Sequence, residues 1–313
     1  MGLEKLSSRA VIGMFYDELA ADPGAAWIKD IAMYFTSDQD TEKYPWIGMV
    51  SKMREWVGGR QPKGFRDNQI EVANKHFEAT LDILVKDLRR DKTGQIRARI
   101  AELATRANAH WASLLSTLLI NAASSVCYDG QYFFDTDHSE GDSGAQDNDL
   151  TVDISGLPAS VHGSTTAPSV EEMQQTILKA ITAILGFKDD QGEPMNETAK
   201  AFRVLTPASL YLTAAKAIAL PIGTGMSEQN VTPDMSIAVS MNPRLTWTDS
   251  ITVFRADGKV KPFIMQEELG IQMKAKAEGS EYEFDNDAHQ YGIDSWRNVA
   301  YGYWQHSCLI QMT

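Results

Sequence analysis

Cysteine is scarce in this 313-residue sequence, and long apolar runs are absent from it. Only Cys127 and Cys308 are present, too few for a disulfide framework, which favours reduced thiols in a cytoplasmic protein. The N-terminal segment has no apolar run long enough for a signal peptide, and the longest uncharged stretch, 107–128, is too polar for a membrane helix. We therefore expect a protein with no membrane partner.

Basic residues are absent from one long window of the chain. The whole sequence has 42 acidic and 29 basic residues, a net charge of −13, which argues against a general duplex-DNA binder. Between Arg106 and Lys179 there are ten acidic residues and no basic one, whereas residues 52–106 hold 13 basic and 8 acidic residues. The acidic window is either a solvated loop or an acidic surface that contacts a basic surface on another copy of the chain.

Familiar catalytic and nucleotide-binding motifs are also missing. The sequence has no phosphate-binding loop, no dinucleotide fingerprint, no HExxH zinc motif, no paired CxxC and no GxSxG elbow. The GDSG run at 141–144 superficially resembles the nucleophile loop of serine proteases, but His138 is only five residues away and the secreted, disulfide-bonded context is lacking. We expect no enzyme activity and no cofactor.

One loop offers a weak candidate for a cation site. Residues 128–168 are rich in Gly, Ser and Asp and poorly patterned, and such long loops are usually functional or mobile. Carboxylate oxygens at Asp135, Asp137, Glu140 and Asp142 suit a divalent ion such as Ca²⁺, although their spacing does not match an EF-hand. The alternative is a solvated acidic loop.

Hydrophobic periodicity predicts an α+β protein with helices in the middle and strands at both ends. Helices are expected over 3–20, 95–123, 169–185 and 207–218, and the second of these has the clearest pattern. Strands are expected over 49–56, 202–206, 237–241, 245–247, 251–255, 263–266, 271–275 and within 299–311. Residues 46–86 are expected to form a long polar β-hairpin with too little apolar content to bury itself, so that it docks elsewhere.

Three blocks of sequence carry a family resemblance. They are WVGGR at 56–60 with NQIEVANKHFEATLDI at 68–83 and DLRRDKTG at 87–94, then YDGQYFFDTDH at 128–138, then QYGID at 290–294. In this order and spacing the sequence resembles the Mu-like phage major head subunit family over nearly its full length. The resemblance implies the Hong Kong 97-type fold of tailed-phage major capsid proteins.

The resemblance also implies a division of the chain into four parts. Residues 1–45 would be an N-terminal arm and 46–86 the extended β-hairpin loop. Residues 87–149 and 246–313 would form the peripheral domain with its long spine helix, and 150–245 the axial domain.

The function implied by the resemblance is that of a capsid subunit. Copies would self-assemble into homo-pentamers and homo-hexamers of an icosahedral shell that encloses DNA without sequence-specific binding. The family further implies a scaffold protein, a portal and a maturation protease as partners, assembly in the host cytoplasm, and a final location in the virion. The basic hairpin residues Arg54, Arg60, Lys63 and Arg66, with Trp56, are candidates for contact with an acidic neighbouring subunit.

Two alternatives stay open from the sequence. A bacterial encapsulin-like compartment shell would share the fold and differ in cargo. More remotely, a metal-dependent hydrolase would use the acidic loop 135–142 and would work as a monomer or small oligomer.

Overall fold

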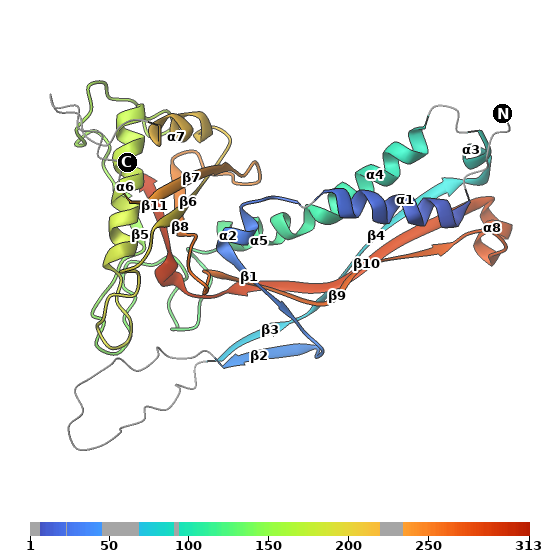
Figure 1. Ribbon diagram of the computed structural model, residues 1–313, viewed down its shortest axis with the longest axis horizontal. Coiled ribbons are helices and arrows are strands. Elements are labelled where there is room, and N and C mark those ends of the chain that lie inside the picture. The colour runs from blue at the N-terminus through green and yellow to red at the C-terminus, as the bar shows by residue number, and fades with distance from the viewer. Residues whose placement is uncertain (1–6, 23, 46–68, 91–93, 220–233) are drawn as a thin grey trace, which may run out of the picture.

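The described residues form two large β-sheets and one two-stranded ribbon, and the two large sheets lie one after the other along a long molecule with two apolar cores (Figure 1). This computed structural model describes residues 7–22, 24–45, 69–90, 94–219 and 234–313. The mixture of helices and strands confirms the predicted α+β class.

The first sheet is long and has four strands in the order β1-β9-β10-β4. Its central strand β10 pairs antiparallel with both β9 and β4, and β1 pairs parallel with β9. Alternate side chains of β10, including Tyr291, Ile293 and Ser295, are buried, as a period of two requires for a strand with one covered face. The strands are β1 (Ala32–Thr36), β4 (Lys75–Leu84), β9 (Phe263–Lys276) and β10 (Ala288–Tyr301).

Helices α1 (Ser8–Ala21) and α4 (Gln95–Asn108) cover this sheet (Figure 1). Val11 and Phe15 of α1 are fully buried in the smaller core, together with Ile100 and Ala104 of α4. Burial of side chains of this size stabilises the folded chain by about 1.5 to 3 kcal/mol each, apart from alanine.

The prediction of one continuous helix over 95–123 is wrong. The structure divides it into α4 and α5 (His110–Ile120), which follow one another along nearly one line (Figure 1). The interruption is limited to Ala109, whose N–H still donates to the Thr105 carbonyl at 2.9 Å, while its carbonyl accepts from the Ser113 N–H at 3.0 Å. The backbone ladder therefore continues through a local turn.

The second sheet has five strands in the order β5-β11-β8-β6-β7 and lies beside α6 (Val170–Gly186) and α7 (Tyr211–Ala217) (Figure 1). Buried side chains of these elements form the larger core. The strands are β5 (Asp149–Val152), β6 (Ala201–Thr206), β7 (Ser236–Met241), β8 (Ser250–Arg255) and β11 (Ser307–Met312).

Three further predictions about strands need correction. Residues 245–247 are not a strand, because the Asn242 side chain accepts from the Arg244 N–H and the Asn242 carbonyl from the Leu245 N–H, which makes a turn after β7. The strands predicted at 263–266 and 271–275 are one strand, β9. The segment 299–311 is divided by η1 (Trp304–His306) into the end of β10 and β11.

A two-stranded ribbon of β2 (Thr41–Pro45) and β3 (Gln69–Ala73) projects from the long sheet (Figure 1). The strand predicted at 49–56 lies outside the described residues. Three short helices were not predicted: α2 (Ile28–Ile31), α3 (Val85–Arg90) and α8 (Glu281–Asn286). Within the described ranges, no helix combines the length and the apolar character that a membrane crossing needs.

The start of α6 is fixed by a capping box at Ser169, the residue at which the sequence predicts this helix to begin. The Ser169 hydroxyl accepts from the Glu172 N–H, and the Glu172 carboxylate accepts from the Ser169 N–H. The same carboxylate, although fully buried, also contacts His162 Nδ1 at 2.9 Å and accepts from the Gly163 N–H at 3.0 Å. Glu172 thereby holds the preceding loop against the helix.

Replacing Glu172 by alanine is expected to lower the free energy of unfolding by about 2 to 3 kcal/mol at neutral pH, because a charged acceptor of several hydrogen bonds is lost. The matched change Glu171→Ala, at an exposed carboxylate bonded to Ser160, should lower it far less, because water replaces that contact at the surface. Urea unfolding of the purified chain measures both.

The effect of Glu172→Ala should depend on pH. Burial alone would raise the pKa of Glu172, but hydrogen bonds from Ser169, Gly163 and His162 outweigh it and hold the pKa below 4.5. A depressed folded-state pKa means that the stabilisation is fully present above pH 4.5 and is lost as the pH falls through the folded-state value. An effect of Glu172→Ala of the same size at pH 7 and at about pH 3 would contradict this assignment.

Candidate functional site

The loop 121–148, which connects α5 to β5, contains the chemistry-bearing residues of the acidic window and is fixed by buried anchors. Phe133 is fully buried, and its ring stacks on that of Tyr301 with the centroids 4.8 Å apart. Asn148 is also fully buried, donating to the Phe133 carbonyl and accepting from the Asp135 N–H, both at 2.9 Å. The loop is therefore ordered although it has little regular secondary structure.

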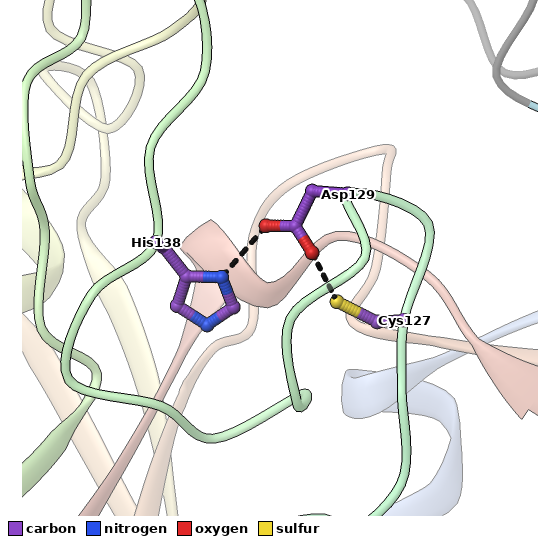
Figure 2. Close-up of side chains that lie close together, drawn as sticks. All are labelled: Cys127, Asp129 and His138. Atoms are coloured by element: carbon purple, nitrogen blue, oxygen red, sulfur yellow. Dashed lines mark hydrogen bonds and ion pairs between the residues drawn. The ribbon is translucent and has the colours of Figure 1, made fainter.

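Within this loop the side chains of Cys127, Asp129 and His138 meet (Figure 2). The Cys127 thiol donates to Asp129 Oδ1, with the sulfur 2.9 Å from the oxygen. The other carboxylate oxygen, Oδ2, lies 2.7 Å from His138 Nδ1. One carboxylate thus accepts from a thiol and from an imidazole at the same time.

The cluster is buried and is held from the C-terminal side. The His138 side chain is fully buried and that of Asp129 is 3% exposed. The His138 ring stacks on the Trp304 indole with the centroids 3.9 Å apart and the planes 9° from parallel. Since Trp304 lies in η1, directly after β10, the cluster joins the loop to the segment that connects the two sheets.

The surroundings shift two pKa values in the cluster. Burial, and then the Asp129 carboxylate, raise the pKa of the Cys127 thiol far above 9.0, so that the sulfur stays protonated at neutral pH. Burial would also raise the pKa of Asp129, but the hydrogen bonds from His138 and Cys127 outweigh it and hold the pKa below 3.8. Asp129 is therefore ionised beside a neutral thiol.

The four acids predicted as weak metal ligands lie elsewhere in the loop. Asp137 and Asp142 are exposed, the Asp135 carboxylate accepts from backbone N–H groups, and Glu140 is half-buried close to Tyr128. Among the described residues, the atoms that lie close enough for metal binding belong to Cys127, Asp129 and His138, and the four acids form no such group.

The serine of the GDSG run contacts only backbone groups nearby. Ser143 Oγ accepts from the Glu140 N–H at 3.0 Å and donates to the Gly144 carbonyl at 2.9 Å. A serine nucleophile of the protease type needs a histidine base beside its hydroxyl, and His138 instead contacts Asp129.

The predicted contact residues of the hairpin, Arg54, Trp56, Arg60, Lys63 and Arg66, lie outside the described residues, and their role stays a prediction. Sequence reasoning did not single out Cys127 or Asp129. The only signal for them was the YDGQYFFDTDH block at 128–138, which contains Asp129 and directly follows Cys127. The sequence could not show their contact with His138, because that contact depends on how the loop folds back.

Comparison with known proteins places the chain in a family. The model of the family described as Mu-like prophage major head subunit gpT matches residues 9–158 and 248–312. This chain belongs to that family.

Two relatives of this Mu-like head subunit show sequence identity over part of their length. The Mu-like prophage FluMu major head subunit of Haemophilus influenzae is 32% identical over 127 residues, 41% of each chain. The major capsid protein of Escherichia phage Mu is 33% identical over 108 residues, 34% of this chain and 35% of the phage protein. The matches therefore span about two fifths of the relatives or less.

The fold of the Mu-like head subunit is matched over more of its length. The subunit in the procapsid of bacteriophage JBD30 superposes with a TM-score of 0.55 at 22% identity, over 96% of this chain and 72% of that one. The fold is thus the Hong Kong 97-type capsid fold that the sequence predicts.

Asp129→Asn is expected to lower the free energy of unfolding of the head subunit by about 3 kcal/mol, because it breaks a buried charged contact with His138. The matched control Asp137→Asn, at an exposed position of the same loop, should change it by less than about 0.5 kcal/mol. Urea unfolding at pH 7 compares them, and equal losses would show that the Asp129–His138 contact does not hold the loop.

Proposed function

We propose that this chain is the major capsid protein of a Mu-like tailed phage or prophage. Copies assemble into pentamers and hexamers, and these form the icosahedral shell around double-stranded DNA. The observation that carries this proposal is the family match in both halves of the chain, combined with likeness to a procapsid subunit over 96% of the chain. Head-to-tail contacts that close into rings are the assembly mode that such a shell requires.

The distribution of exposed apolar side chains supports assembly through several surfaces. Phe284 of α8 is 90% exposed and Leu84, at the end of β4, is 41% exposed, both at one end of the molecule. Leu212 of α7 is 69% exposed at the opposite end (Figure 1). Large apolar side chains in water at both ends suit a tile that contacts different neighbours with different surfaces.

The four-part division of the chain belongs to the same proposal. Strands β9 and β10 of the long sheet, with α4 and α5, support a peripheral domain built from 87–149 and 246–313, and α6, β6 and α7 support an axial domain over 150–245; β1 and β4 of the same sheet come from the arm and the extended loop. The arm is 1–45 and the extended loop 46–86. The pairing of β2 with β3 makes the end of the arm continuous with that loop.

Electrostatic contact between copies is part of the proposed assembly. The basic residues Arg54, Arg60, Lys63 and Arg66 of the extended loop approach the acidic loop of a neighbouring subunit. Asp137 and Asp142 are exposed on that loop. Their carboxylates can therefore contact a partner without breaking the buried Cys127–Asp129–His138 cluster. Complementary charge sets register and speeds encounter more than it adds affinity.

The remaining features follow from a shell role. The subunit encloses DNA without sequence-specific contacts, consistent with its net charge of −13. It has no enzyme activity, it assembles in the host cytoplasm with a scaffold, a portal and a maturation protease, and it resides in the virion.

Electron microscopy and sizing of the purified protein test the function. Shells or capsomer rings are expected. DNA-free shells that package a protein cargo would instead indicate an encapsulin-like compartment. A stable monomer with hydrolytic turnover that a chelator abolishes would overturn the capsid proposal.

Replacing Arg54, Arg60, Lys63 and Arg66 together by alanine should reduce shell yield at least about tenfold while the unassembled subunit keeps its stability, because these charges contact a neighbour rather than their own core. Electron microscopy with urea unfolding measures both quantities.

The control has the same change of net charge elsewhere, with alanine at four exposed basic positions: Arg97, Arg99, Lys188 and Lys259. It should assemble at higher yield than the hairpin variant. Normal shells from the hairpin variant would rule out the electrostatic contact.

A further inference from the structure

The cluster of Cys127, Asp129 and His138 brings together three kinds of metal ligand in one loop: a sulfur, a carboxylate and an imidazole nitrogen. Their ligand atoms all lie within 4.8 Å of one another. Cysteine, histidine and aspartate are the ligands that Zn²⁺ takes in proteins, and a thiolate among them disfavours Mg²⁺ and Ca²⁺. We propose that Cys127, Asp129 and His138 bind one Zn²⁺ ion, which cross-links the loop to itself.

The distances in the cluster require an adjustment of about one ångström. Around a tetrahedral zinc with bonds of about 2.0 to 2.3 Å, neighbouring ligand atoms are about 3.3 to 3.7 Å apart. Asp129 Oδ1 now lies 2.9 Å from Cys127 Sγ, and Oδ2 lies 2.7 Å from His138 Nδ1. Because these contacts use different carboxylate oxygens, one oxygen must turn toward both partners, and ligand atoms that now lie within 4.8 Å of one another must all reach the zinc spacing by side-chain rotation.

Charge balance favours the ion over the protons that it replaces. In the metal-free cluster the Asp129 carboxylate accepts a hydrogen bond from the Cys127 thiol through Oδ1 and one from His138 Nδ1 through Oδ2. On binding, the Cys127 thiol proton leaves to solvent and the His138 proton moves from Nδ1 to Nε2, which frees Nδ1 for the metal. One Zn²⁺ with one thiolate and one carboxylate then gives a neutral site, and burial penalises a neutral site least.

The surrounding structure positions the ligands in advance. The stacking of Trp304 fixes the plane of the His138 ring, and the bridge between His138 and Gln146 fixes its backbone. The Cys127 N–H donates to the Gln131 carbonyl at 2.8 Å. Such supports fix the geometry of the ligands and strengthen metal binding.

Access and potential also suit a cation. Cys127 is only partly buried, so the ion can enter, and a water can complete the coordination, from its side. The whole window between Arg106 and Lys179 has ten acidic residues and no basic one that would repel a cation.

Cobalt substitution of the full-length protein tests the proposal. After chelator treatment, Co²⁺ should bind with one ion per chain and give the absorption band of thiolate-to-cobalt charge transfer, and Zn²⁺ should displace it. Cys127→Ser should abolish the band, whereas the matched control Cys308→Ser, at a buried cysteine outside the cluster, should retain it. Asp129→Asn and His138→Gln should each weaken Co²⁺ binding by more than about tenfold.

Circular dichroism establishes that each variant is folded, and Cys127→Ala replaces Cys127→Ser if the latter is not. Absence of stoichiometric Co²⁺ and Zn²⁺ binding by the wild-type chain would overturn the proposal. So would a charge-transfer band that persists in both Cys127 variants. Neither result depends on whether the protein builds shells.

Discussion

The antiparallel pairing of β10 with β9 is the interaction on which the rest of the subunit depends. β10 occupies an interior position of the long sheet, between β9 and β4, and its buried face supports α1 and α4. The chain then passes through η1 into β11, an interior strand of the second sheet. Because β10 and β11 are consecutive and each is an interior strand, the short segment with η1 joins the two sheets through their interiors rather than at their edges.

The polar groups buried along this link are paired with aromatic rings. The Arg297 guanidinium is 1% exposed, lies 4.7 Å from the centre of the Trp111 ring in α5, and donates through Nε to the Ser295 hydroxyl. A desolvated contact of this kind contributes about 2 kcal/mol. Just beyond the same end of β10, in η1, Trp304 stacks on His138. These two contacts hold α5 and the acidic loop against the end of β10 and the segment that follows it, which helps to explain why a loop with little secondary structure is ordered.

Local signals in the sequence were sufficient where the structure is locally determined. Hydrophobic periodicity identified α6, predicted over 169–185, and the strands β6 and β8, predicted over 202–206 and 251–255. Predictions failed where tertiary contacts decide the local structure. The break between α4 and α5 falls at Ala109, whose side chain does not disfavour a helix. The strand predicted at 245–247 is wrong because Asn242 makes a turn there through its hydrogen bonds. The cluster was missed for the same reason, since Cys127 and His138 are separated by ten residues of irregular chain whose return path is set by Phe133 and Asn148 in the core.

The acidic window then divides into two populations with different physical roles. Asp129, Asp135 and Glu172 are engaged with a histidine, with backbone N–H groups or with both, so their charges are satisfied inside the subunit. Asp137 and Asp142 face solvent, where a charge is available to a partner and is screened by salt. The net excess of acidic residues therefore overstates the surface charge that a neighbour meets. A contact between these exposed carboxylates and a basic partner should consequently respond to ionic strength, whereas the fold of loop 121–148, fixed by its buried contacts, should not.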